Sequence, residues 1–305
     1  MSRSIPTDPL SSGIFNLSIL ETLIGKLGTG RDELSLLKVS LHCWTFIGNG
    51  DDVYHSYGAN TGLIIGKEAC LVVDTGFHLR TANQLLSVAR KHSSKRLYVL
   101  NTHYHSDHVF GNFPFTEAGA SIVAHENCRR SMLDQSEGLL NKYRKRNKRL
   151  AELLRSVKVS YPSIAFRNNL TLHLDEDTTV DIVHPVAVAH TNGDSVAVCR
   201  EEGTVFAGDI FWNMYHPNLE DARIKGQIQA LQWILKTRPR RIVPGHGRVA
   251  SPDDVRTAIR YLRELEKSIR AVRAHKKPAT NLIPPWTRNW KMKWLMDEYL
   301  RGLRQ

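Results

Sequence analysis

The sequence is poor in cysteine and has no long apolar run. Its 305 residues include four cysteines without CxxC spacing: Cys43, Cys70, Cys128 and Cys199. This spacing argues against a disulfide framework or a thiolate metal site, and it favours reduced, mostly buried thiols in a cytoplasmic protein. No apolar stretch approaches the length that crosses a bilayer. The first residues, MSRSIPTDPLSSG, lack a basic region followed by a long apolar core, so we expect neither a secretory signal nor membrane attachment.

Acidic residues are fewer than basic ones. The 42 Lys and Arg residues exceed the 30 Asp and Glu residues, for a formal charge of +12. Such an excess favours acidic partners such as nucleic acid, an anionic membrane or an acidic carrier protein. The densest basic block, KYRKRNKR at 142–149, has six basic side chains in eight positions. Its simplest interpretation is the solvated face of a helix.

Short repeats and low-complexity linkers are also missing, which predicts one compact α/β domain. Residues 1–34 are expected to form an irregular arm with a short helix near Ile14–Lys26. After them, two similar halves at 35–125 and 170–245 alternate between strands and helices, with the helices outside. Residues 251–305 are expected to add helices packed on the same domain.

Two periodicities predict the elements of these halves. Apolar, β-branched runs bounded by turn residues predict strands at 36–46, 61–66, 69–74, 96–100, 121–125, 170–174, 178–185, 195–200 and 204–209, and at 241–245. Apolar groups at helical spacing predict helices at 78–92, 227–236, 252–275 and Trp286–Leu303, and a long charged helical insertion at about 126–157.

The stretch NTHYHSDHVFGN, residues 101–112, follows the predicted buried strand at 96–100 and is rich in metal-ligand residue types. It places His103, His105, Asp107 and His108 within six positions. Four such side chains on one turn suit a core poorly, because each buried polar atom there needs a partner. A divalent cation would satisfy all of them at once.

Three more residues of ligand type follow at the ends of predicted strands. His190 lies in the turn AHTNGDS, Asp209 ends the apolar run in FAGDIF, and His246 lies between two glycines in IVPGHG. Ligands collect at the carboxyl ends of strands in open α/β sheets, so these side chains are expected to converge on one sheet edge.

This series of motifs, together with VVDTG at 72–76, resembles that of the metallo-β-lactamase superfamily over about residues 35–250. The resemblance implies a four-layer αββα sandwich with a dinuclear site at one edge of its two sheets. It assigns the first metal to His103, His105 and His190. It assigns the second metal to Asp107, His108 and His246, with Asp209 bridging both. Asp74 resembles the outer acid that orients a ligand loop in this family.

Five imidazoles and two carboxylates suit two zinc ions, although iron or manganese also fit. Three or four protein ligands per metal leave open positions for water and substrate. Two such cations about 3.5–4 Å apart can share a water and bring its pKa near 7. We therefore expect a metal-dependent hydrolase in which a bridging hydroxide attacks a carbonyl group, while Asp107 holds this hydroxide and shuttles its proton.

The substrate class is open between several possibilities. Asp209 stands where the best-known zinc β-lactamases carry cysteine, and HTNGDS replaces the Pro-Gly-His typical of glyoxalase II and the acyl-homoserine lactonases. These segments resemble bacterial β-lactamase-like hydrolases of the quinoprotein-relay type. An ester, lactone, thioester or amide substrate therefore remains open, as in a lactonase or thioesterase. The alternatives are a phosphodiesterase or nuclease of the ribonuclease Z type, favoured by the basic charge, and a β-lactamase or an inactive binding homologue.

Seven further side chains are predicted to contact a small-molecule substrate. They flank the motifs above: Tyr54, His55, Tyr57 and Asn60 in DDVYHSYGAN, and Met214, Tyr215 and His216 after Asp209. The helix at 126–157 is a candidate lid whose basic face would dock an acidic acyl-carrier protein. The sequence carries no signal for oligomeric state.

Overall fold

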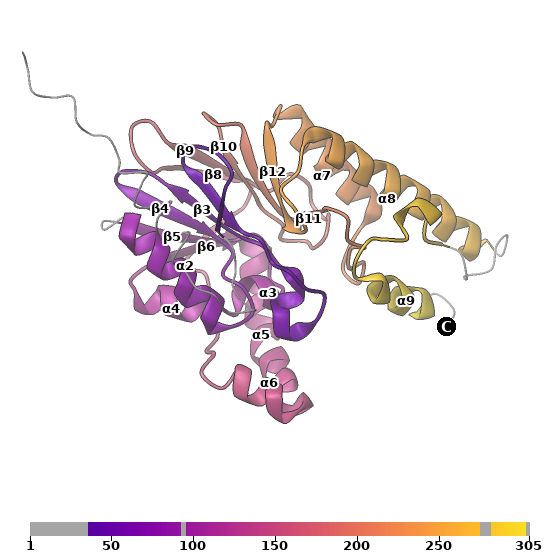
Figure 1. Ribbon diagram of the computed structural model, residues 1–305, viewed down its shortest axis with the longest axis horizontal. Coiled ribbons are helices and arrows are strands. Elements are labelled where there is room, and N and C mark those ends of the chain that lie inside the picture. The colour runs from indigo at the N-terminus through magenta and orange to yellow at the C-terminus, as the bar shows by residue number, and fades with distance from the viewer. Residues whose placement is uncertain (1–35, 93–95, 275–281, 303–305) are drawn as a thin grey trace, which may run out of the picture.

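The computed structural model describes residues 36–92, 96–274 and 282–302 (Figure 1). The predicted N-terminal arm and its short helix lie outside the described residues. None of the helices within these ranges is both long and apolar enough to cross a membrane.

The first sheet combines antiparallel and parallel strands in the order β1-β2-β3-β4-β5-β6-β7. The bounds are β1 Leu36–Lys38, β2 Cys43–Phe46, β3 Thr61–Ile65, β4 Ala69–Val73, β5 Arg96–Asn101, β6 Ser121–His125 and β7 Ile164–Phe166. β1 to β4 pair antiparallel, and β4 to β7 pair parallel. The carboxyl ends of β4, β5 and β6 therefore lie at one edge.

The second sheet has the order β12-β11-β10-β9-β8. The bounds are β8 Asn169–His173, β9 Thr179–Val183, β10 Val196–Cys199, β11 Thr204–Trp212 and β12 Arg241–His246. β8 to β11 pair antiparallel, whereas β11 and β12 run parallel. The parallel pair brings the second half of β11 and the end of β12 together, which is where Asp209 and His246 stand.

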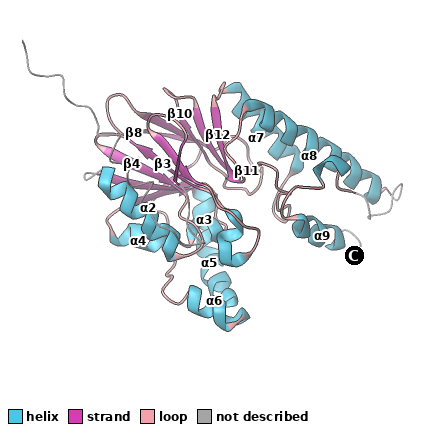
Figure 2. Ribbon diagram, viewed as in Figure 1, coloured by secondary structure: helices cyan, strands magenta, loops and turns pink. Residues whose placement is uncertain are grey.

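Helices cover the outer face of each sheet (Figure 2). The bounds are α2 Leu79–His92, α3 Ser106–Val109, α4 Asn112–Glu117, α5 Glu126–Arg146, α6 Lys148–Leu153, α7 Ile224–Lys236, α8 Pro252–Arg273 and α9 Lys293–Gly302, with 3₁₀ turns at Val53–Gly58 and Pro285–Thr287. α2 packs on β3 and β4, and α7 and α8 pack on β11. Between the sheets, Leu71 and Val123 of the first belong to one apolar core with Ile182 and Phe206 of the second. The predicted αββα sandwich is confirmed.

Local details differ from the sequence-based prediction in four places. The run at 36–46, predicted as one strand, forms β1 and β2 joined by a turn in which the N–H groups of Val39 and Ser40 donate to Cys43 O. β7 was not predicted, because a three-residue strand carries too little pattern. In place of one helix at Trp286–Leu303, a 3₁₀ turn precedes α9, because Met292 stands between them with a φ of +57°, which a right-handed helix cannot contain.

The long charged helix predicted at 126–157 is likewise two helices. Asn147 separates α5 from α6 with an extended backbone, and its Oδ1 accepts the N–H of Leu150 at 2.9 Å. Asparagine is among the best N-cap residues, so it favours a new helix start over continuation.

Gly138 in the middle of α5 offers a test of this helix. A Cβ at Gly138 would meet nothing within 4 Å. We expect Gly138→Ala to raise the free energy of unfolding by about 0.5–1 kcal/mol, because glycine costs a helix interior that much relative to alanine. Thermal denaturation checks this, with Gly226→Ala as the contrast. In α7 the new Cβ would lie 1.8 Å from Val188 O, so that variant is expected to lose stability.

Candidate metal centre

The seven candidate ligands come from strand ends and turns of both sheets. Residues 102–108 follow β5 and run into α3. His190 lies in the turn between β9 and β10, Asp209 is in β11, and His246 ends β12. The N–H of Ser195 donates to Thr102 O at 2.7 Å, which joins the two halves beside the site. The fold thereby brings together side chains from four separate segments of the chain.

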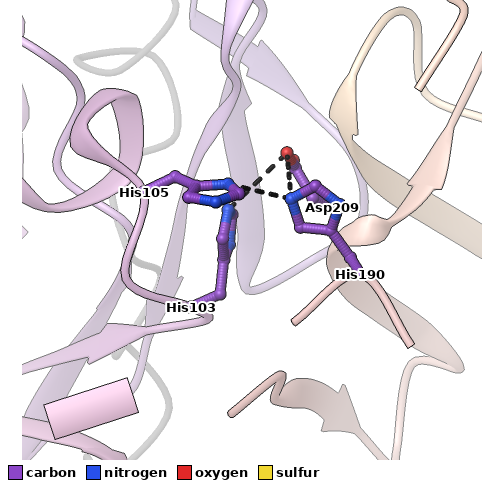
Figure 3. A group of neighbouring side chains, drawn as sticks. All are labelled: His103, His105, His190 and Asp209. Carbon is purple, nitrogen blue, oxygen red and sulfur yellow. Dashed lines mark hydrogen bonds and ion pairs between the residues drawn. The ribbon is translucent and has the colours of Figure 1, made fainter. Parts of the chain in front are cut away.

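Three imidazoles and one carboxylate form the first group (Figure 3). His190 Nε2 lies 2.9 Å from His105 Nδ1 and 3.4 Å from Asp209 Oδ2. His103 Nε2 lies 3.6 Å from the same oxygen. One ligand atom from each of the four residues lies within 4.8 Å of all the others.

The second group consists of Asp107, His108 and His246, whose ligand atoms also lie within 4.8 Å of one another. Asp107 Oδ2 is 3.6 Å from His108 Nε2 and 3.5 Å from His246 Nε2. Asp209 Oδ1 is 3.2 Å from His108 Nε2 and 3.4 Å from His246 Nε2. Asp209 therefore directs one carboxylate oxygen at each group.

The donor atoms are spaced like the ligands of a divalent metal ion. Nitrogen and oxygen ligands at about 2.0–2.2 Å from a tetrahedral zinc lie about 3.3–3.6 Å from one another, which matches most of the distances above. His103 Nε2, His108 Nε2, His246 Nε2 and Asp209 Oδ1 are buried without a hydrogen-bond partner. Buried polar atoms are normally paired, and a cation between these atoms would satisfy them.

Other side chains and one carbonyl fix the orientation of the imidazoles. His108 Nδ1 lies 2.9 Å from Asp74 Oδ2, and Asp74 accepts the N–H and hydroxyl of Thr102 at 2.8 and 2.7 Å. His246 Nδ1 donates to the carbonyl of Tyr57 at 3.0 Å. These contacts leave the Nε2 atoms of His108 and His246 directed at the second group. Such partners set the tautomer and direction of histidine ligands.

Electrostatics at the site favour a bound cation. Burial lowers the pKa of His103 well below its usual value and that of His190 to about 3, so both imidazoles are in the neutral form that binds metal. Burial opposes charge on His108 too, but the carboxylates of Asp209, Asp107 and Asp74 outweigh it and raise the pKa of His108. The carboxylates thus attract positive charge to the second group.

Of the seven residues predicted to contact substrate, Tyr57 and Tyr215 lie next to a candidate ligand, while Asn60 and His216 have other contacts. Tyr57 and Tyr215 lie beside His246: the Tyr57 carbonyl accepts its Nδ1–H, and the Tyr215 ring is 6.0 Å from its ring. Asn60 is buried and donates to Pro244 O and Gly247 O, both at 2.8 Å, so it holds the end of β12. His216 points elsewhere, since its Nδ1 lies 2.9 Å from the hydroxyl of Tyr261 in α8.

The remaining three of these residues lie nearer the surface. The Tyr54 ring lies under the Arg149 guanidinium at 3.9 Å, and His55 Nδ1 is 2.9 Å from Asp52. Met214 is 42% exposed and contacts Arg248 through its sulfur. The structure gives none of the three a contact with the candidate ligands.

Two residues of the site had no recognisable sequence signal. His105 Nε2 donates to Asp221 Oδ2 at 3.4 Å, and Tyr104 also donates to this carboxylate. Asp221 lies in an irregular segment 116 residues from His105, so no spacing could identify it. Trp212 stacks on His246 with ring centroids 4.0 Å apart. Trp212 ends β11, and nothing in the sequence distinguishes it from an ordinary core residue.

Comparison with known proteins agrees with this geometry. The family model of the metallo-β-lactamase superfamily matches residues 57–246, more than half of the chain. The chain belongs to the metallo-β-lactamase superfamily. A beta-lactamase-like protein 2 homolog of Drosophila melanogaster is 27% identical over 194 residues, which are 63% of this chain and 59% of that protein. The chain thus spans about three fifths of the length of this curated relative.

Solved metallo-β-lactamases share the superfamily fold. The enzyme from Pontibacter korlensis superposes with a TM-score of 0.61 at 17% identity, over 76% of this chain and 99% of that one. The DIM-1 metallo-β-lactamase exposed to ceftazidime gives 0.58 at 19% identity, over 76% and 97%. One from Erythrobacter litoralis with β-mercaptoethanol in its active site gives 0.58 at 16%, over the same shares. The superfamily consists mostly of metal-dependent hydrolases, and this member carries the His and Asp clusters of a candidate divalent-metal site.

The role of Asp221 can be tested by Asp221→Asn. We expect zinc affinity to fall about tenfold. Loss of a residue that orients a metal ligand costs about 10–100-fold in affinity, and the effect should be small here because the Asp221 side chain is 43% exposed. Competition with a chelator of known affinity measures the dissociation constant for zinc. Glu220→Gln, a change at the adjacent exposed acid, is the matched control. Equal zinc affinity of both variants and the unchanged chain would contradict a positioning role for Asp221.

Proposed function

We propose that this chain is a dinuclear metal hydrolase that acts on a carbonyl substrate: an ester, lactone, thioester or amide. The observation that carries the proposal is the Asp209 carboxylate, which faces His103 and His190 with one oxygen and His108 and His246 with the other. In this arrangement Asp209 would hold a metal ion with each of its oxygens, as a bridging ligand. The presence of all seven ligand-type residues in two close groups favours an active enzyme over an inactive homologue.

The imidazole and carboxylate ligands favour zinc, although iron or manganese would also bind to them. Two such ions would supply a water of lowered pKa and positive charge beside the carbonyl oxygen of the substrate.

The chain's own residues define the direction of substrate approach. Side chains of His103, His108, His190, Asp209 and His246 are 0–2% exposed. His105 and Asp107 are 19% and 12% exposed, so the site opens to solvent on their side. Asp107 is therefore the carboxylate best placed to hold the attacking water and to accept its proton.

A groove of about 1180 Å³ near Tyr57 is a candidate site for the rest of the substrate. One wall is the C-terminal half of α5, and others are the 3₁₀ turn at Val53–Gly58 and α9. The Tyr57 hydroxyl lies 3.3 Å from that of Tyr143 on the α5 wall, while the Tyr57 carbonyl holds His246. Tyr57 thus links this groove to the metal ligands, and Trp294 adds a further aromatic face.

Kinetic assays with a substrate panel test the proposal. Chromogenic lactone, thioester, β-lactam and phosphodiester substrates are assayed with the metal-loaded protein, the chelated protein and the protein reloaded with zinc. We expect hydrolysis of at least one carbonyl class, loss of this activity on chelation, and recovery with zinc. Turnover of a carbonyl substrate that survives exhaustive demetallation would contradict the proposal.

Phosphodiester hydrolysis is the second candidate, because Lys142, Lys145 and Arg146 line the groove. Phosphate contacts made by such residues release counterions, so binding falls steeply with salt. The affinity for single-stranded and transfer RNA between low and physiological salt distinguishes this candidate. Strong, salt-dependent binding together with phosphodiester turnover favours it over carbonyl chemistry.

The same basic side chains support a proposal that an acidic acyl-carrier protein presents the substrate. We expect Lys145→Glu with Arg146→Glu to raise KM for a carrier-bound thioester about tenfold, at unchanged kcat for a small neutral thioester. Tenfold corresponds to about 1.4 kcal/mol, the size expected for two solvent-exposed charges at an interface. Arg130→Glu, also exposed on α5 but outside the groove, is the control. Equal KM values for both variants would contradict carrier docking here.

A further inference from the structure

A second cluster of metal-ligand side chains lies apart from the candidate metal centre. The ligand atoms of Cys43, Cys199 and Glu202 all lie within 4.8 Å of one another. Cys43 begins β2 of the first sheet, Cys199 ends β10 of the second, and Glu202 lies in the turn between β10 and β11. Cys43 pairs in register with Ile64, which pairs with Leu71, so the cluster lies toward the end of the sandwich opposite Asp74.

We propose that Cys43, Cys199 and Glu202 bind a structural zinc ion that joins the two sheets. Two thiolates make this a softer site than the imidazole and carboxylate centre, and soft ligands select zinc over magnesium, calcium or manganese. Tetrahedral zinc places sulfur and oxygen ligands about 3.5–3.8 Å apart, so ligand atoms within 4.8 Å of one another need to approach by no more than about 1.3 Å.

The local chain geometry supports this site. Cys199 and Glu202 have the spacing of two ligands separated by two residues, as in structural zinc sites, where such pairs stand on a tight turn. Gly203 follows with a φ of +59°, a conformation that glycine supplies without strain. The cysteine spacing argues against a thiolate site because it has no CxxC pair, but the second ligand on this turn is a carboxylate.

The carboxylate of Glu202 is already held for such a role. His42 donates its backbone N–H to Glu202 Oε1 at 2.7 Å, its ring Nδ1 lies 2.6 Å from the same oxygen, and Ser40 Oγ donates to Oε2. The Glu202 side chain is only 9% exposed, and the His42 ring, 33% exposed, leaves solvent access for a fourth ligand. Carboxylates that bind metal ions are held by hydrogen bonds from outer partners in the same way.

Without a cation the surroundings of the Cys43 thiol favour its neutral form over the thiolate. Cys43 and Cys199 are fully buried. Burial raises the pKa of the Cys43 thiol well above its usual value, and Cys199 and Glu202 raise it further, because a thiolate beside a carboxylate is repelled. A divalent cation would turn this repulsion into attraction and bind the deprotonated thiols.

Cobalt substitution tests the site without any activity assay. Protein purified under argon is stripped of metal and loaded with Co²⁺, and thiolate-to-cobalt charge-transfer absorption is recorded in the near ultraviolet. The other candidate centre contains no cysteine, so this absorption reports Cys43 and Cys199 alone. We expect the band in the unchanged chain and in His103→Ala, and its loss in Cys43→Ser and Cys199→Ser. Cys70→Ser and Cys128→Ser, which change the other two buried thiols, are the matched controls.

Zinc content and thiol counts complete the test. We expect Cys199→Ser to contain one zinc fewer per chain than Cys70→Ser, and His42→Ala to bind this zinc about tenfold more weakly. Because cysteine variants can fail to fold, Glu202→Gln, which keeps the size of the side chain, is expected to show the same loss of metal. The proposal is overturned by absence of a thiolate band in the cobalt protein, by a band that survives in Cys43→Ser, or by a Cys43–Cys199 disulfide in the argon-purified chain.

Discussion

Asp209→Ala is expected to lower kcat/KM about 10³-fold, equivalent to a loss of about 4 kcal/mol of transition-state stabilisation. The reason is that Asp209 alone contacts both ligand groups, at 3.4 and 3.6 Å on one side and 3.2 and 3.4 Å on the other. Without it the two sites are no longer joined, and Asp107 is the one carboxylate left among the seven candidate ligands to offset the mutual repulsion of two cations. Emission spectroscopy should show at least one metal ion fewer per chain than in the unchanged protein.

Asp181→Ala is the matched control for this experiment. Asp181 stands in β9 of the same sheet, but its carboxylate accepts from Arg200 away from the centre. This variant should keep its metal content and its activity. If Asp209→Ala likewise kept both, Asp209 would not be the bridging ligand and the dinuclear proposal would be wrong.

The fold could be predicted in outline because its signals are local. An apolar run at 96–100 became β5, and helical spacing at 78–92 became α2. The local exceptions have local causes: Asn147 starts a new helix where charge patterning alone suggested continuation, and β7 is too short to have a period.

The candidate site was predictable for a different reason. Parallel pairing places the carboxyl ends of β4 and β5 at one edge of the first sheet, and His246 beside the second half of β11 in the second sheet. The packing of the two sheets, joined here by the bond from Ser195 N–H to Thr102 O, then brings these strand ends together. Residues in irregular segments carry no such constraint. Asp221 reaches His105, and His216 turns toward Tyr261, through contacts that depend on the whole packed structure.

Gly245→Ala is expected to lower both metal content and kcat/KM, the latter about a hundredfold, although it removes no ligand. A Cβ at Gly245 would lie 1.9 Å from Asp209 Oδ1 and 2.9 Å from its backbone N, closer than real Cβ contacts. The added methyl group therefore has to displace the oxygen that faces His108 and His246. A hundredfold loss is about 2.7 kcal/mol, within the range that overpacking costs a well-packed interior.

Gly119→Ala separates this displacement from a general loss of stability. Gly119 has a φ of +81° and open space around its Cβ position, so alanine there costs about 1–2 kcal/mol of backbone strain but touches nothing. We expect this variant to unfold at lower temperature while it keeps full metal content and activity. Gly245→Ala should instead lose metal content and activity at temperatures well below the one at which it unfolds. If the metal content of Gly245→Ala were intact, the Asp209 oxygen next to Gly245 would not be a ligand, because no bound carboxylate could share its position with that methyl group.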